Sequence, residues 1–294
     1  KKSEEVNKMG VFTKNKKEPE PQYYTSATNM KTMNYKVYHM GVGEKTVTFL
    51  IAFVVAACVG YLFYGGIGVD EYGNPTTLTW ILNISIPSIL GIIAGRFFIP
   101  LREEQIIKKR KKNLRLQFRD MLDSLNTSIG SGKNVPESMI AVYDDLKVQY
   151  DEDADIIHEM EVILSGLHNN VDIEDMLLDF GKRSGIDDII SFANVFKISY
   201  RKGGNLKDII RNTHSILSDK MEIEDDIETL VSSNKLEQNI MIVMPIALIA
   251  IIKMMSADFA KNFVTATGIV STTLAIIMFV VAYIIGKKVL DINV

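Results

Sequence analysis

Four apolar stretches, arranged as two pairs around a charged block, constrain this chain more than any local motif does. The stretches are Thr46–Tyr64, Leu78–Pro100, Asn239–Ala257 and Thr267–Gly286. Each has close to the ~20 residues that a helix needs to cross a hydrocarbon core of ~30 Å. Between the second and the third lies Leu101–Gln238, which is rich in Lys, Arg, Asp and Glu. The pattern predicts an all-α polytopic membrane protein with four transmembrane helices that hold a soluble domain against the membrane from both ends.

The third stretch is the weakest of the four. Its uncharged core, Gln238–Ile252, is short, and Lys253 interrupts the apolar run near one end. A lysine at this position can extend its ammonium group to the interface while its methylene stem stays in the apolar layer. Pro245 is tolerated inside a membrane helix when neighbouring groups satisfy the carbonyl that it frees. We interpret Arg96, near the end of the second stretch, in the same way as Lys253.

The placement of Lys and Arg predicts the orientation of the helices. Lysines are frequent in residues 1–45, in the run Lys108–Lys112 and at Lys287 and Lys288, whereas the loop Gly65–Thr77 contains neither Lys nor Arg. We therefore expect the N-terminus, the central domain and the C-terminus in the cytoplasm, which an even number of crossings allows. The run Lys108–Lys112 is interpreted as a determinant of this topology that lies against anionic lipid headgroups.

The domain organisation is expected to follow these boundaries. Residues 1–45 are polar, Lys-rich and poorly periodic, which predicts a mostly disordered cytoplasmic tail. Residues 46–100 and 239–286 are each expected to form a pair of transmembrane helices. Residues 101–238 are expected to form the cytoplasmic domain, and residues 287–294 a C-terminal tail.

Apolar residues of the central block recur at helical spacing, and no stretch shows the alternation of a strand convincingly. Helices are expected over about 114–129, 136–150, 157–167, 173–180, 186–200 and 206–238. Their ends are marked by Gly130, Gly132 and Gly203-Gly204, and their starts by Pro136, Asp172 and Asn205. The sixth helix is expected to continue, with little or no break, into the third apolar stretch. Short loops between one-sided helices predict a compact antiparallel six-helix bundle.

No local motif predicts catalysis or cofactor binding. The run Arg201–Leu206 contains two glycines, but a P-loop needs the longer spacing Gly-x4-Gly-Lys-Ser/Thr after a strand. We interpret the run as a helix end followed by a cap, with a partner-contacting loop or a nucleotide contact as alternatives. His158-Glu159 lacks the second histidine of a zinc-protease motif, because Val162 occupies that position. The single cysteine, Cys58, excludes an intramolecular disulfide and a cysteine-rich metal site. The protein is therefore expected to be no enzyme, with no cofactor and no metal.

Acidic residues gather around one connection between helices. They are Asp144, Asp145, Asp151, Glu152, Asp153 and Asp155. A solvated loop accounts for such a cluster, and a docking face for a basic partner is the alternative. Nucleic acid is not expected as a partner, because the basic run lies so close to a membrane end.

Two segments of the central block resemble the type II secretion F domain. The first is Phe118–Leu125 continued through Gly130–Met139, which is similar to a helical hairpin of that family, LPDAL-x-x-L…L-x-x-G-x-S-L-P-x-A-L. The second is Lys202–Ile210, which is similar to the family's turn G-G-N-L-x-E-x-L. Met244-Pro245 resembles the Leu-Pro that opens the family's next membrane helix.

The family occurs in inner-membrane platform proteins of type II secretion, type IV pili, Tad (tight adherence) pili and archaeal flagella. A single copy of the domain after two membrane helices resembles the Tad platforms, since the type II secretion and type IV pilus platforms carry two copies. Arg119 stands where the family has Pro, and Asn134-Val135 replaces Ser-Leu. The resemblance implies a non-enzymatic platform in the cell (inner) membrane. It would contact a cytoplasmic assembly ATPase, help to lift pilin subunits out of the lipid bilayer, and pack beside a sister platform protein or another copy of itself.

Loop position and charge select candidates for the partner interface. They are Arg119, Asp120, Asp144, Asp145, Arg201, Lys202, Gly203, Gly204 and Asn205. An alternative function is a membrane signalling receptor with a cytoplasmic helical effector domain, although its two short outer loops would leave little to sense. A small transporter is disfavoured, because the apolar stretches contain no carboxylate that could form an ion path.

Overall fold

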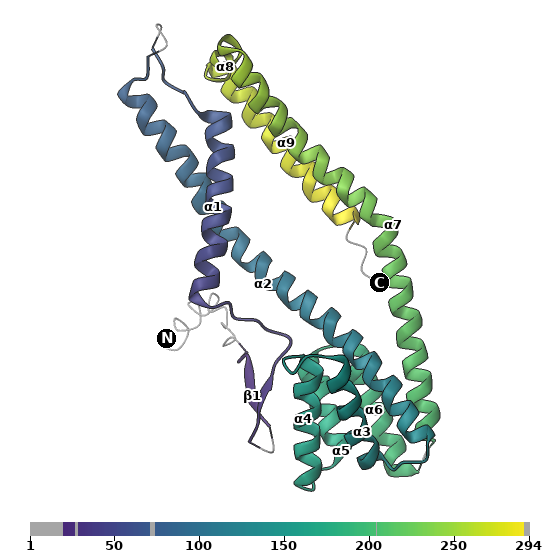
Figure 1. Ribbon diagram of the computed structural model, residues 1–294. Helices are drawn as coiled ribbons and strands as arrows, with labels where there is room; N and C mark the ends of the chain where they lie inside the picture. The colour runs from purple at the N-terminus through teal and green to yellow at the C-terminus, as the bar shows by residue number, and fades with distance from the viewer. Residues whose placement is uncertain (1–19, 27–28, 71–73, 204, 291–294) are drawn as a thin grey trace, which may run out of the picture.

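The computed structural model describes residues 20–26, 29–70, 74–203 and 205–290, and helices predominate in them (Figure 1). The helices are α1 (Val42–Tyr64), α2 (Thr77–Gly130), α3 (Val135–Gln149), α4 (Asp155–His168), α5 (Ile173–Ser184), α6 (Asp187–Lys202), α7 (Leu206–Met255), α8 (Ala257–Phe263) and α9 (Ala266–Leu290). Two short strands, β1 (Tyr23–Thr25) and β2 (Lys31–Met33), form the only sheet of the described residues. The prediction of a helical protein is confirmed.

Four helices, α1, α2, α7 and α9, are long and apolar enough to cross a membrane, as the four apolar stretches predicted. Their large side chains face outward: Ile93 is 62%, Val243 61% and Val281 50% exposed. Continuous apolar surface of this extent is not tolerated in water. The four helices therefore indicate a membrane protein.

Helices α1 and α2 pack closely along an antiparallel contact (Figure 1). Glycines of α2 make the close approach possible, because a Cβ atom at Gly91 would lie 2.6 Å from the Phe53 ring and one at Gly95 would lie 2.5 Å from the Phe49 ring. Small residues at such a contact let two helix backbones approach where lipid supplies no hydrophobic driving force. Aromatic rings of α1 thus fill the space that the missing side chains of α2 leave.

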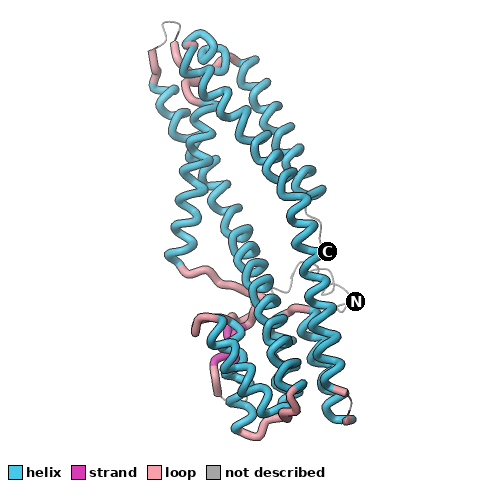
Figure 2. The backbone as a smooth tube through the Cα atoms, turned by 45° about the vertical axis from the view of Figure 1, so that its right-hand side comes forward, coloured by secondary structure: helices cyan, strands magenta, loops and turns pink. Residues whose placement is uncertain are grey.

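The second helical pair, α7 and α9, joined by α8, meets α1 at the end farthest from the soluble domain (Figure 2). There Lys253 Nζ donates to the Leu62 carbonyl at 2.6 Å, and the hydroxyls of Tyr64 and Thr273 lie 2.9 Å apart. We expected the Lys253 ammonium to extend to the lipid interface, and the structure shows that it binds a carbonyl of the last turn of α1. Because that turn has carbonyls without helical partners, a cation satisfies one of them.

Both α2 and α7 continue from the apolar layer into the soluble domain. They comprise 54 and 50 residues, which at ~1.5 Å per residue gives rods of roughly 80 and 75 Å. The continuity of α7 was predicted, whereas that of α2 was not, since we placed the end of the second apolar stretch at Pro100. Pro100 lies inside α2, because the residues that follow it favour a helix and the loss of one backbone hydrogen bond does not stop it.

The soluble domain consists of the C-terminal part of α2, helices α3 to α6 and the N-terminal part of α7. These helices pack in chain order, and α7 closes the arrangement against α2. Apolar faces at helical spacing meet in one core that includes Phe118, whose ring lies edge-on to those of Phe180 and Phe192. The helix ends occur where the sequence predicted them: Gly203 adopts a positive φ of 71° after α6, and Asn205 caps α7 through the Asp208 amide.

Residues 20–26 and 29–41 are an ordered part of the fold, which corrects the prediction of a disordered tail over residues 1–45. Strands β1 and β2 pair antiparallel, with Tyr24 opposite Thr32. Beyond β2 the chain inserts Tyr35 into the core, where it is 1% exposed, and α1 then begins at Val42. Strands of three residues are too short to show alternation, which explains why the sequence pattern missed them. Residues 1–19 lie outside the described residues.

Replacing Gly91 by Ala is expected to lower the free energy of unfolding in detergent by about 1–3 kcal/mol, because the new methyl group overlaps the Phe53 ring. Gly43→Ala is the matched control, since a Cβ atom there meets nothing within 4 Å. Denaturant titrations followed by fluorescence of the single tryptophan, Trp80, would measure both changes. Equal stability of the two variants would contradict the close α1–α2 contact.

Candidate functional site

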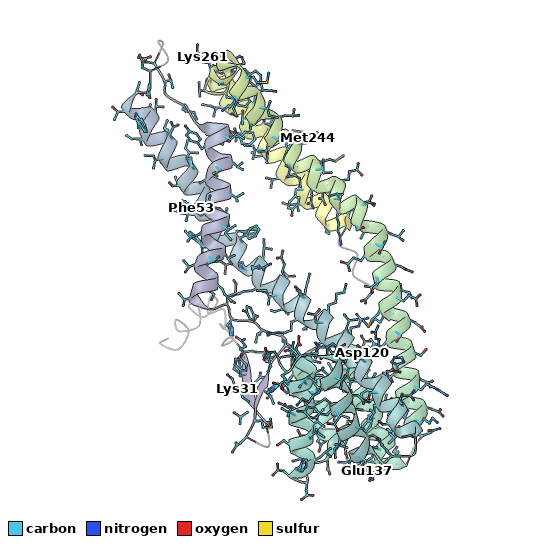
Figure 3. The ribbon with its side chains drawn as sticks, viewed as in Figure 1. Lys31, Phe53, Asp120, Glu137, Met244 and Lys261 are labelled. Carbon is cyan, nitrogen blue, oxygen red and sulfur yellow. The ribbon has the colours of Figure 1, made fainter. Side chains whose placement is uncertain are left out.

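The predicted interface residues Arg119 and Asp120 lie in the middle of the domain part of α2 (Figure 3 labels Asp120). Arg119 donates to Asp120 at 2.8 and 2.9 Å, and Asp120 also accepts from the Tyr150 hydroxyl and, at 3.3 Å, from Gln149. Burial and the hydrogen bond to Asp120 raise the pKa of Tyr150 to about 12. Asp120 therefore fastens the end of α3 to α2, and its carboxylate is committed within the domain.

Asp144 and Asp145 are exposed on α3. Asp145 accepts from the Ser124 hydroxyl of α2 at 2.6 Å. Asp145 thus lies beside α2, the helix that carries Arg119 and Asp120, and Asp144 precedes it on α3. Neither acid belongs to the α6–α7 turn. The eight predicted residues that the structure describes consequently form two separate groups.

The second group surrounds the turn between α6 and α7. This turn lies at the end of the domain farthest from the apolar helices, the end at which Figure 3 labels Glu137. Arg201 donates to Glu174 at 2.7 Å and to Asp172 at 3.4 Å, so it fastens the end of α6 to the start of α5. These carboxylates raise the pKa of Arg201. Lys202 and Gly203 are exposed, whereas Gly204 lies outside the described residues.

A charged cluster between the two long helices is the feature that sequence reasoning missed. Arg115 of α2 donates from Nη1 to both carboxylate oxygens of Glu224 in α7, at 2.7 and 2.9 Å. Its Nε lies 3.2 Å from the carboxylate of Asp188 at the start of α6, within ion-pair distance but without the alignment of a hydrogen bond. Lys220 of α7 donates to the same carboxylate at 3.1 Å. We call Lys112, Arg115, Asp188, Lys220, Glu224 and Glu228 the α2–α7 seam.

The seam changes from half-buried to exposed toward the apolar helices. The Arg115 and Glu224 side chains are 15% and 27% exposed, whereas those of Lys112 and Glu228, which pair at 2.7 Å, are 53% and 60% exposed. The hydrogen bond between this exposed pair raises the pKa of Lys112 and lowers that of Glu228. Since water screens exposed pairs, Arg115 carries most of the energy of the seam.

A second buried cluster holds the N-terminal hairpin on the domain. Arg183 of α5 forms two hydrogen bonds to the Glu159 carboxylate of α4, at 2.6 and 2.7 Å, and a third to the Met33 carbonyl at 3.0 Å. The Tyr35 hydroxyl donates to the same carboxylate at 2.9 Å. Burial opposes the charge of Arg183, but its carboxylate partners outweigh this effect and raise its pKa. We call Tyr35, Glu159 and Arg183 the hairpin latch.

The basic run Lys108–Lys112 was interpreted as a topology determinant, and the structure gives three of its members partners outside α2, whereas Lys108 pairs with Glu104 of the same helix. Arg110 lies 3.7 Å from Asp155, Lys111 donates to the Gly185 carbonyl at 3.1 Å, and Lys112 belongs to the seam. A signal for the seam did exist in the sequence, because Arg115 extends the basic face of α2 while α7 carries acids at Glu224 and Glu228. Pairing two charge runs more than a hundred residues apart requires the fold.

Among the described residues, no group of three or more His, Cys, Asp or Glu side chains is placed to hold a metal ion. His158 instead lies 2.8 Å from the Lys31 carbonyl, where it contacts the hairpin. Comparison with protein families, with curated proteins and with solved structures finds no match for this chain.

Reversing the central pair of the seam tests its energy. Arg115→Glu is expected to lower the free energy of unfolding by about 2–4 kcal/mol, because it places a third carboxylate beside those of Glu224 and Asp188 in a half-buried site. Adding Glu224→Arg should recover about half of that loss or more, as a double-mutant cycle in denaturant would show. Lys112→Ala is the exposed control, with an expected loss below about 1 kcal/mol. Independent effects of Arg115→Glu and Glu224→Arg would contradict the pairing.

The hairpin latch is expected to make stability depend on alkaline pH. Burial and the neighbouring Glu159 carboxylate raise the pKa of Tyr35, so the folded state keeps this hydroxyl protonated. Its contribution is complete below the unfolded pKa of about 10 and declines as the pH rises above it. Tyr35→Phe should cost about 1–3 kcal/mol at pH 8 and less at pH 11. Tyr23→Phe is the control, and a pH-independent cost of Tyr35→Phe would contradict the latch.

Proposed function

We propose that the protein is a platform subunit of a Tad-type pilus or a type II secretion-like machine in the cell membrane. In this proposal it couples a cytoplasmic assembly ATPase to the extraction of pilin and the assembly of a filament. The soluble domain would then lie in the cytoplasm, and the protein would be no enzyme itself. The resemblance of Phe118–Met139 and Lys202–Ile210 to the type II secretion F domain gives the proposal its direction.

One observation carries the proposal: α2 and α7 each run without a break from the soluble domain into the apolar layer. A long α-helix curves only gently except at kinks, which prolines such as Pro100 of α2 and Pro245 of α7 can cause. Because neither helix is interrupted, a displacement applied to the domain would move the apolar parts of both helices. The α2–α7 seam holds the two helices together within the domain. A force on one helix would therefore be shared by the other.

The apolar helices offer surfaces against which a pilin's hydrophobic segment would pack. A cavity of about 250 Å³ lies between α1, α7 and α9, with Val59, Phe63 and Ile246 among its lining residues. A second one of about 420 Å³ lies between α7 and α9 beside Met241 and Phe279. Both are lined mostly by apolar side chains, which suits a helix in lipid. A sister platform protein or a second copy would occupy other lipid-facing surfaces.

The experiment is co-purification of the full chain, in mild detergent, with the assembly ATPase of its own cell. Lys202→Glu tests the α6–α7 turn and Asp144→Lys tests the α2–α3 group, since both side chains are exposed. Arg201→Glu is unsuitable, because it would also break the contact with Glu174. We expect a stoichiometric complex that one of the two variants weakens about tenfold or more.

The outcomes distinguish a wrong prediction of the contact face from a wrong prediction of the platform role. A complex that survives both reversals keeps the platform role and discards both predicted faces. No complex with the folded protein, combined with normal filaments in a deletion strain, would contradict the role itself.

A further inference from the structure

Helix α7 carries an apolar ridge on the outer surface of the soluble domain. Ile216, Ile223 and Leu230 are 65%, 53% and 73% exposed, although they precede the apolar part of the helix. They recur every seven residues, so they lie on one face. Buried residues of the same helix, such as Leu217 and Met221, point to the core instead. The ridge is thus separate from the face that holds α7 in the fold.

The neighbouring helix extends this apolar surface. Val195 of α6 is 46% exposed and lies seven residues after Asp188, which contacts Lys220 of α7. Two turns of helix place Val195 on the same side as Asp188, facing α7. Aliphatic side chains from both helices therefore border one outer surface.

Acidic side chains flank the ridge. Residues 215–230 contain six acids (Asp219, Glu222, Glu224, Asp225, Asp226 and Glu228) and one base, Lys220, so the segment has a net charge of 1 − 6 = −5. The seam uses Lys220, Glu224 and Glu228, and Asp225 lies 3.6 Å from Lys112. Asp219, Glu222 and Asp226 are exposed, and none of them forms an ion pair with another described residue.

A second copy of the chain does not suit this surface. Both copies would enter the membrane through α7 in the same direction, so their α7 helices would run parallel. With Ile216, Ile223 and Leu230 at the a positions of such a pair, Asp219 and Asp226 would fall at the d positions, which require apolar residues. With the same three residues at the d positions, Lys220, which already binds Asp188, would fall at an a position. Equal charges would then face each other across the contact. An anionic membrane surface is repelled by the same carboxylates.

We propose that the outer face of α7 is the docking site of a cationic amphipathic helix from a partner protein. Its apolar residues would pack on Ile216, Ile223 and Leu230 at the spacing of helix-in-groove recognition. Its Lys or Arg residues would lie against Asp219, Glu222 and Asp226. The site is defined by α7 and α6 alone and does not depend on the proposed platform function. A partner there would hold the helix that runs into the membrane.

The probe is a fluorescent synthetic helix of about 18 residues with Leu at helical spacing and Lys beside it. A companion peptide has Glu in place of every Lys. Fluorescence anisotropy would measure the binding of each to the full chain in nanodiscs of a neutral phosphatidylcholine. We expect the Lys peptide to bind about tenfold tighter than the Glu peptide, and its affinity to fall with added salt.

Variants locate the binding on the surface of the domain. Ile223→Ser, and separately Asp219→Lys with Asp226→Lys, should each weaken binding of the Lys peptide about fivefold or more. Val148→Ser on α3 is the matched control, because Val148 is 90% exposed and lies on another helix. The Val148→Ser variant should bind the Lys peptide with the same affinity as the unmodified chain.

Three results would overturn the proposal. One is equal affinity for the Lys and Glu peptides, and another is unchanged binding after Ile223→Ser and after the aspartate reversals. The third is efficient cross-linking between copies through Ile223→Cys in a Cys58→Ser background, which would make a second copy the occupant.

Discussion

The arrangement of the soluble domain depends on the contact that closes it, in which Arg115 of α2 meets Glu224 of α7 and Asp188 of α6. The other helices follow one another in chain order, and each packs on its neighbours, whereas this contact joins the first and last helices of the domain. The ion pairs of Arg115 form the half-buried side of this contact, and the apolar core of the domain forms its other side. Both α2 and α7 continue into the apolar layer. The same contact therefore determines the distance between the two helices where they leave the domain.

Above the domain the two helical pairs separate, and they meet again at their far end (Figure 2). There the Lys253 ammonium binds the Leu62 carbonyl, and Tyr64 lies beside Thr273. The molecule is thus fixed at two places, the seam and this far contact, with apolar surfaces between them. The hairpin latch adds a third link, since it fastens the segment that leads into α1 to helices α4 and α5. All three links connect elements that are distant in the sequence.

The helices themselves were predictable because their signals are local. Gly203 ends α6, Asn205 caps α7, and apolar spacing identifies the core face of each helix, so neighbours along the chain define each element. The links were not predictable in the same way. Tyr35 is one of four tyrosines in a polar segment (residues 21–40), and only the fold brings Glu159 and Arg183 to it. Arg115 and Glu224 are separated by 109 positions, so neither residue carries a sign of the other. Arg201 was predicted to contact a partner, and only the fold shows that its side chain, which is 54% exposed, also pairs with Glu174 and Asp172.

Mechanical continuity of α2 and α7 is the central claim, and a break in the rods tests it most directly. A few glycines inserted after Glu104 in α2 and after Ser233 in α7 would uncouple the domain from the apolar helices without touching the core. The same glycines inserted after Gly132, in the turn before α3, provide the control. Filament assembly by cells carrying each version is the measurement. If the protein is the proposed platform and the rods transmit movement, the two helix insertions abolish filaments while the control retains them, and the proposed ATPase partner still binds all three versions. Filaments of normal number and length after both helix insertions would contradict the coupling.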